Sequence, residues 1–328
     1  MEDTRAQEPY IASVPCNIPA EVIAIIISQV DDRKTFSSLC LANRFVWYEA
    51  VRWLYRDVDD VPYKAEFHLK RLSSIASNPK LPPLVQSFSL LRMTRPARYS
   101  EEALRELIGG EKDFTKRMIL VEQLLSLLLE KVLPSMINLK RLEYGSRRPM
   151  RETGDLLYTP EGSVVVFQLR MLRWGNSWDD SFIDFIRTQK WLKALALGSV
   201  WCSSEAIINY RLPQDVCDRL TALSGDQRVV EAILPFAPGV KSVELDIGRP
   251  NDQRGLFGPK VDMKATGHLA KAMPQLTRLI LHNYSTRTPI STFGPEALSG
   301  LRVLVVDCML DEHESVSINL PLVRSSVS

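Results

Sequence analysis

The sequence predicts an α/β protein in which a small unit of three N-terminal helices precedes an irregular solenoid of strands and helices. Two observations lead to this prediction. Residues 16–58 contain three short helical patterns with more apolar surface than three short helices can bury among themselves. Between residues 62 and 310, a helical pattern followed by apolar residues spaced three and then two apart returns several times. Such a recurring unit is typical of a solenoid, with a parallel sheet on its concave face and helices on its convex face.

The composition is that of an ordinary globular protein. The chain has 328 residues, of which 45% are hydrophobic and 24% charged, and its net charge of +2 gives no sign of a nucleic-acid partner. The five cysteines are scattered and form no CxxC pair, which favours a reducing compartment. The polar start, residues 1–15, is predicted to be disordered and is not a secretory signal. No apolar run approaches the ~20 residues that span a bilayer. We expect an intracellular protein, cytoplasmic or nuclear, without membrane association.

The first predicted helix is apolar on two sides. It starts near Pro19, which suits a first helical turn. Ile23 and Ile27 fall off its main stripe, and Asp31-Asp32 then offers a stop signal and a new N-cap. The main stripe consists of Ile18, Val22, Ile25, Ile26 and Val30. The third helix has a stripe of its own, formed by Trp47, Val51, Leu54 and Tyr55. A unit of about 40 residues rarely folds alone without a disulfide, a metal or a partner, so we infer that the surplus apolar surface docks on another surface.

Three segments of this unit carry a specific resemblance. They are Ile18-Pro19-x-Glu21-Val22, Leu39-Cys40-Leu41-Ala42-Asn43-Arg44-Phe45 and Leu54-Tyr55-Arg56-Asp57-Val58. Together they resemble an F-box, most closely that of fungal F-box proteins, with Ile18 in place of the usual leucine. The resemblance implies binding to the Skp adaptor of a cullin–RING ubiquitin ligase through Ile18, Pro19, Glu21, Val22, Ile25, Ile26, Val30, Leu39, Phe45, Leu54 and Tyr55. The alternative is an ordinary three-helix cap on the downstream domain.

The repeats of the second part follow one order: a helix, often a proline, and then an extended apolar triad. A helix from about 64 to 76 ends at Asn78-Pro79, and another from Met118 to Leu133 ends at Pro134. The triads are Val85/Phe88/Leu90, Leu139/Leu142/Tyr144, Leu169/Leu172/Trp174, Leu192/Leu195/Leu197, Val240/Val243/Leu245, Leu276/Leu279/Leu281 and Leu301/Leu304/Val306, with a weaker copy at Leu220/Leu223. Their signature resembles that of leucine-rich repeats without the usual asparagine, which implies irregular repeats. The alternative is that leucine-rich helices produce the pattern by chance.

Two insertions and a tail stand outside this array. Residues 146–164 and 248–258 are rich in turn-forming residues and are expected to be loops, of the kind that often bind partners. Residues 269–273 are expected to form a further helix. Residues 311–328 carry little apolar surface and are interpreted as a tail without a clear capping repeat.

The alternation of side chains along a strand predicts which residues face outward. If the triads point into the core, the residues between them are exposed on the concave sheet, as a surface of mixed charge that suits a protein partner. The predicted target-binding residues are Arg141, Glu143, Met171, Arg173, Ser242, Glu244, Asp246, Arg278, Ile280 and His282, and Ala194, Ala196, Val303 and Val305 share their face.

No motif in the sequence indicates a catalytic centre. The four histidines are far apart, and no phosphate-binding glycine loop or nucleophile elbow is present. Asp179-Asp180 is interpreted as a helix N-cap rather than a carboxylate pair, and the tryptophans at 174, 178, 191 and 201 as core or rim packing. We therefore expect no enzyme activity, metal or cofactor.

The favoured hypothesis is a substrate-recognition adaptor of a ubiquitin ligase, with an unknown target protein. The alternatives are a repeat scaffold with no ligase role and an enzyme whose site is assembled from scattered residues.

Overall fold

The computed structural model describes residues 18–42, 44–58, 65–90, 114–145, 167–175, 179–197, 212–246, 275–284, 300–311 and 314–321. The chain divides into two compact units, residues 1–56 and 57–328. The stretch 1–15, the insertions at 146–164 and 248–258, and the helix expected at 269–273 lie outside the described residues.

The first unit contains three helices where the sequence predicts them: α1 (Ala20–Ser28), α2 (Arg33–Ala42) and α3 (Arg44–Arg56). Pro19 is the N-cap residue of α1 instead of lying in its first turn, because its backbone is extended while its carbonyl already accepts hydrogen bonds from Val22 and Ile23. The helix α3 packs against both α1 and α2. Among the residues of this unit whose side chains are described, the buried apolar ones are few: Ile27, Phe36, Ala50 and Val51.

The predicted N-cap of the second helix is confirmed at Asp32. Its carboxylate accepts hydrogen bonds from the backbone N–H groups of Lys34 (3.1 Å) and Thr35 (2.8 Å). The hydroxyl of Thr35 also donates to this carboxylate, and this bond, followed by the two backbone bonds, lowers the pKa of Asp32 below its usual value. The cap satisfies donors that the first turn of a helix leaves without partners.

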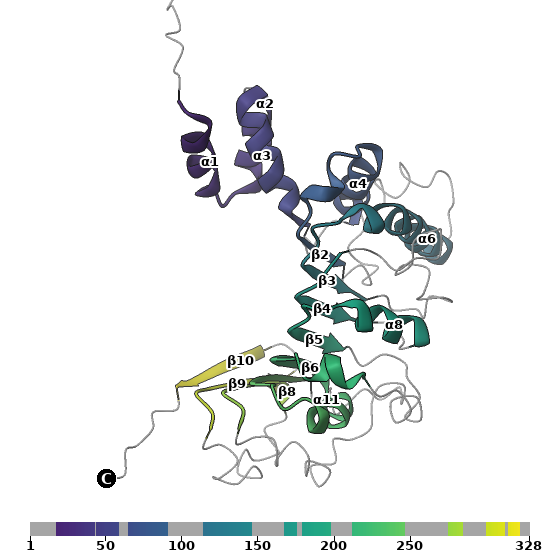
Figure 1. Ribbon diagram of the computed structural model, residues 1–328, viewed down its shortest axis with the longest axis vertical. Helices are drawn as coiled ribbons and strands as arrows, with labels where there is room; N and C mark the ends of the chain where they lie inside the picture. The colour runs from purple at the N-terminus through teal and green to yellow at the C-terminus, as the bar shows by residue number, and fades with distance from the viewer. Residues whose placement is uncertain are drawn as a thin grey trace, which may run out of the picture. The chain divides into compact units, whose positions relative to one another are not determined.

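In the second unit the described residues form a ten-stranded sheet whose strand order follows the chain (Figure 1). The strands are β1 (Asp57–Val58), β2 (Ser87–Leu90), β3 (Arg141–Tyr144), β4 (Met171–Trp174), β5 (Ala194–Leu197), β6 (Ala222–Asp226), β7 (Ser242–Asp246), β8 (Arg278–Tyr284), β9 (Val303–Asp311) and β10 (Glu314–Pro321). All neighbours from β1 to β9 pair in parallel. The predicted α/β class and the shared parallel sheet are confirmed, and the order is compatible with a solenoid.

Helices lie along one side of this sheet. Figure 1 shows α4, α6, α8 and α11 on the same side of the strands. The helical segments of this unit are α4 (Ala65–Ser77), η1 (Pro82–Leu84), α6 (Phe114–Val132), η3 (Leu133–Ser135), α8 (Asp180–Thr188), α10 (Gln214–Cys217), α11 (Gln227–Ile233) and η4 (Leu234–Phe236). Pro134 lies in the 3₁₀ turn η3 directly after α6, and Pro235 lies in η4 after α11, because proline lacks the N–H that would continue an α-helix; Pro79 lies in a turn after α4.

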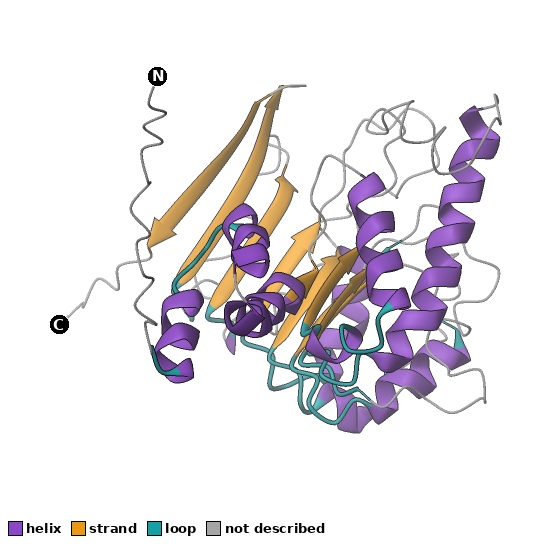
Figure 2. Cartoon of the chain, turned by 90° about the horizontal axis from the view of Figure 1, so that it is seen from above, coloured by secondary structure: helices purple, strands orange, loops and turns teal. Residues whose placement is uncertain are grey.

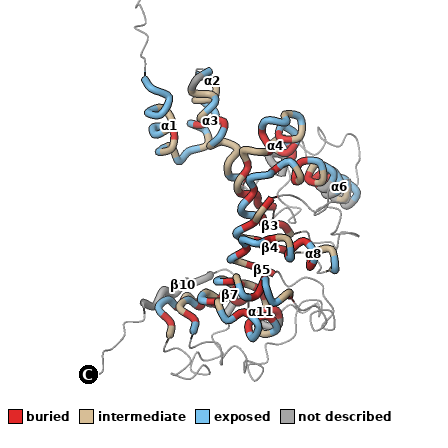
Figure 3. The backbone as a smooth tube through the Cα atoms, viewed as in Figure 1, coloured by how far each residue is buried: buried red, intermediate tan, exposed pale blue. Residues whose placement is uncertain are grey.

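The core lies between the sheet and these helices. The inward residues of successive strands are buried (Figure 3): Phe88, Leu90, Leu142, Tyr144, Leu172, Trp174, Leu195, Leu197, Leu223, Val243, Leu245, Leu279, Leu281, Leu304 and Val306. Trp174 stacks on Phe182 of α8, with ring centroids 5.3 Å apart, and meets Tyr144 of β3 at 5.4 Å. The expectation that Trp174 is a core residue is therefore confirmed, whereas Trp191 is 60% exposed.

The N-cap interpretation of Asp179 is also confirmed. Its side chain accepts a hydrogen bond of 2.8 Å from the backbone N–H of Phe182 and so starts α8. This placement turns the apolar face of α8, with Phe182 and Phe185, into the core. Asp179 therefore has a structural role in the described fold.

Both ends of the sheet differ from the sequence interpretation. Asp57 and Val58, which we grouped with the helical unit, form β1 and pair with Ser87 and Phe88 of β2. The stretch interpreted as a tail from 311 contains β10, which pairs antiparallel with β9 (Figure 2). An antiparallel pair can be joined by a tight turn without a helix, so this last strand lacks the helix–strand spacing that predicts the others. Within the described ranges, no helix has both the length and the apolar character needed to cross a bilayer.

Candidate partner-binding surfaces

The outer face of α1 exposes the apolar stripe predicted from the sequence. Ile25 and Ile26 are 63% and 55% exposed, and Ile18 and Val22 are exposed as well. Ile27 lies on the other side of the helix and is buried. Successive residues of an α-helix are turned by about 100°, which places Val22, Ile25 and Ile26 together and opposite to Ile27. The helix therefore uses one apolar face for its own unit and leaves the second one open.

The other residues predicted to contact the adaptor are distributed over the unit. Pro19 and Glu21 are exposed, and Val30, Leu39, Leu54 and Tyr55 are half-buried. The side chain of Phe45 lies outside the described part. Two further exposed apolar residues, Leu41 and Tyr48, were not predicted. The signal for Leu41 was present in the sequence, since it belongs to the segment that resembles an F-box, but its exposure at the end of α2 follows only from the packing.

The open face of the sheet, the face opposite to the helices, is arranged in rows by the strand register. One row contains Ser87, Arg141, Met171, Ala194, Ala222, Ser242, Arg278 and Val303. The next contains Ser89, Glu143, Arg173, Ala196, Ser224, Glu244, Ile280 and Val305. A short third row contains Asp226, Asp246 and His282. The register thus brings every predicted target-binding residue onto this face; the side chain of Asp246 lies outside the described part.

Glu143 and Ala196 of this face are buried, contrary to the expectation that they are exposed, and so are Ser87 and Ser89 in the same rows. Only 7% of the Glu143 side chain is exposed, because Arg141 folds over it and donates two hydrogen bonds to its Oε1 atom, one of them from Nε at 2.9 Å. The hydroxyl of Ser89 donates to the Oε2 atom at 3.0 Å. Ala196 is buried because its short side chain lies between Arg173 and Ser224 in the row.

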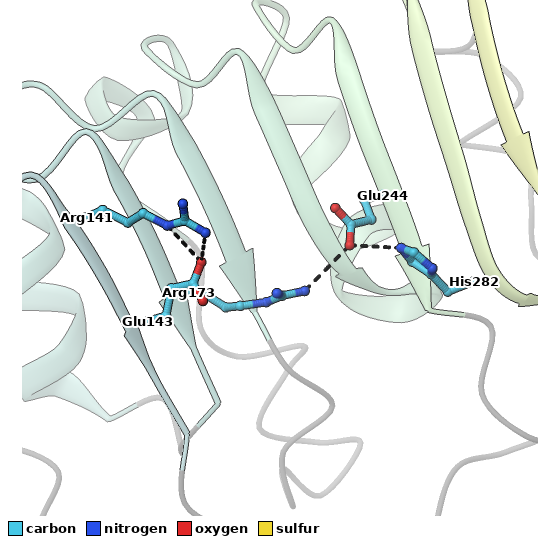
Figure 4. A network of polar contacts seen from close by, with 5 residues as sticks. All are labelled: Arg141, Glu143, Arg173, Glu244 and His282. Atoms are coloured by element: carbon cyan, nitrogen blue, oxygen red, sulfur yellow. Dashed lines mark hydrogen bonds and ion pairs between the residues drawn. The ribbon is translucent and has the colours of Figure 1, made fainter. Parts of the chain in front are cut away.

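A second group of charges centres on Glu244 (Figure 4). Its Oε1 atom lies 3.5 Å from Nη2 of Arg173 and 3.0 Å from Nε2 of His282. Arg173 belongs to β4 and Glu244 to β7, so the pair crosses two intervening strands, β5 and β6. Those strands carry Ala196 and Ser224 in this row, and their small side chains leave room for the pair. Since both partners are partly exposed, the ion pair contributes at most about 1 kcal/mol.

The contribution of Arg141 to stability can be tested, because its partner Glu143 is a buried carboxylate. We expect Arg141→Ala to lower the free energy of unfolding by about 2 kcal/mol, because it leaves a buried carboxylate with Ser89 as its remaining described partner. Adding Glu143→Gln should recover about 1 kcal/mol, since it removes the buried charge. Urea unfolding of the two variants and the parent measures both values. Equal stability of Arg141→Ala and the parent would show that Arg141 does not stabilise Glu143.

The described thiols show no activation. Burial raises the pKa of the Cys217 thiol to about 11, with smaller contributions from Asp218 and Asp215, and burial also raises the pKa of Cys40. A nucleophilic cysteine needs the opposite shift, toward a thiolate at neutral pH. Among the residues that the structure describes, no group of three or more His, Cys, Asp or Glu side chains could hold a metal ion.

A comparison of the sequence with the models of known protein families gives no match, and a comparison with curated proteins gives none either.

Proposed function

We propose that the chain is a substrate-recognition adaptor of an SCF-type cullin–RING ubiquitin ligase, and that residues 16–58 act as an F-box. The observation that carries this proposal is the second apolar face of α1, with Ile18, Val22, Ile25 and Ile26 exposed. Full burial of a large apolar side chain stabilises by about 1.5–3 kcal/mol, so such a face favours a protein partner. An amphipathic helix that lays its apolar side into a hydrophobic groove is a common mode of recognition. The partner would be the Skp adaptor.

The second unit would be an irregular leucine-rich-repeat domain that holds the target protein. Its open face presents charges of both signs, Arg141, Arg173, Glu244 and Arg278, beside the apolar Met171 and Ile280. Mixed polarity of this kind suits a protein surface. Charge reversal at Arg173 or at Glu244 should weaken target binding. A variant that still bound every partner of the parent would show that the target does not bind at this face.

In this proposal the chain itself breaks no bond. By binding the ligase through one unit and the target through the other, it raises the effective concentration of a target lysine near the ubiquitin-carrying subunit. The protein would act inside the cell, in the cytoplasm or the nucleus.

The test is complex formation with the purified Skp adaptor. Size-exclusion chromatography with light scattering should give a complex of one chain and one adaptor. If the two proteins elute separately, the chain is a repeat scaffold for protein interactions without a role in ubiquitin ligation, and the exposed face of α1 serves another partner.

A further inference from the structure

A row of cations follows the edge of the sheet at which the parallel strands begin. Lys140, Arg170, Lys193, Lys241 and Arg302 each stand directly before a strand, namely β3, β4, β5, β7 and β9. All five are exposed, and we call this row the basic edge. The loops that lead into the strands run together along this edge (Figure 2).

Backbone hydrogen bonds fix these residues at equivalent positions. The N–H of Arg170 donates to the carbonyl of Lys140 at 2.7 Å, and the N–H of Lys193 donates to that of Arg170 at 2.9 Å. The series continues through Thr221, Lys241 and Thr277 to Arg302. Adjacent strands are about 4.8 Å apart, so the row from β3 to β9 is roughly 29 Å long.

The cations of the basic edge have no anionic partner among the described residues. No side chain of the five takes part in an ion pair or a hydrogen bond with a described residue. The described carboxylates at this edge precede β6, where Asp215 pairs with Arg219 and Asp218 accepts a hydrogen bond from Gln214. The whole chain carries a net charge of only +2, so the row is a local concentration of positive charge. Like charges on neighbouring strands repel, and an anionic partner would relieve this repulsion.

Exposed apolar side chains accompany every second strand of the row. Ile137 lies in the turn before β3, Trp191 in the turn before β5, and Phe236 in η4 before β7. All three are exposed, and each precedes a strand that also carries a cation of the basic edge. Ile137, Trp191 and Phe236 stand four, three and six residues before their strands, and those strands are two strand spacings, about 9.6 Å, apart, which matches three residues of an extended peptide. Exposed apolar side chains next to the cations favour a polypeptide as the binding partner over the phosphate backbone of a nucleic acid.

We propose that the basic edge binds an extended acidic segment of a partner protein, in which an apolar residue recurs at every third position. Its carboxylates would meet Lys140, Lys193 and Lys241, and its apolar residues would pack on Ile137, Trp191 and Phe236. This interaction is independent of α1 and of the open face of the sheet, so it stands apart from the adaptor function proposed above.

Fluorescence anisotropy with the full chain and a labelled peptide of four Leu-Glu-Glu repeats tests the proposal. We expect the parent to bind this peptide and Lys140→Glu/Lys193→Glu to bind it about tenfold more weakly. The matched control is Lys70→Glu/Lys131→Glu, which changes the net charge equally at exposed positions of α4 and α6 and should bind within about twofold of the parent. Trp191→Ala should weaken binding also at about 300 mM salt, where exposed charges are largely screened.

Three results would overturn the proposal. The first is absence of binding to the parent. The second is an equal loss in both double variants, which would indicate a response to net charge alone. The third is tighter binding of an oligothymidylate than of the peptide, which would make this edge a nucleic-acid surface. Thermal melting of each variant serves to confirm that it is folded.

Discussion

The double substitution Ile25→Lys/Ile26→Lys is expected to weaken binding of the Skp adaptor at least about a hundredfold. These two isoleucines are the most exposed members of the outer stripe of α1, and a charge on each would have to be desolvated in an apolar groove. Lysine is a good helix former and is favourable near a helix C-terminus, so α1 should persist. Isothermal titration calorimetry of the parent and the variant measures the loss.

The matched control for this experiment is Leu124→Lys/Leu127→Lys. Both leucines are exposed on α6, in the second unit, so the control places the same charges on another apolar helix face. It should bind the adaptor as tightly as the parent. Equal loss of affinity in the two variants would show that the adaptor binds exposed apolar surface nonspecifically and not a site on α1.

The largest effect on stability is expected from Trp174→Ala. Trp174 is only 1% exposed and packs between Phe182 and Tyr144, so its removal leaves a cavity in the core between sheet and helices. The free energy of unfolding should fall by about 3–5 kcal/mol. Chemical denaturation of the full chain, followed by a spectroscopic signal from the second unit, measures this change.

Trp191→Ala provides the comparison, because it deletes the same side chain at a position that is 60% exposed. It should change the free energy of unfolding by no more than about 0.5 kcal/mol. If both variants lost the same amount, the inward row of the sheet would not form the core of this unit.

The apolar triads predicted the parallel sheet because each strand is marked by the spacing of a few residues that are close in the sequence. In Leu139, Leu142 and Tyr144, for example, the change from a three-residue to a two-residue spacing marks the point where the chain enters a strand. The same register then places Arg141 and Glu143 on the opposite face. The end of the sheet was not predicted, since β10 pairs antiparallel with β9 and follows no helix.

The details of the surfaces depend on residues that are distant in the sequence. Glu143 is buried through Ser89, which lies 54 residues earlier, and through the way Arg141 folds back over it. No pattern in either segment indicates this contact. The basic edge has a sequence signal, one cation directly before each of five strands, but it emerges only when the strands are aligned by their pairing. The outer stripe of α1 was predictable because two apolar stripes on one short helix cannot both face the same core.

Hydrogen exchange of the chain alone and in the presence of the Skp adaptor tests the central claim most directly. We predict that the adaptor adds protection to the backbone amides of α1, Ala20–Ser28, and leaves those of β3–β7 unchanged. Unchanged exchange in α1, or new protection in the strands instead, would contradict the claim that the second apolar face of α1 is the docking surface.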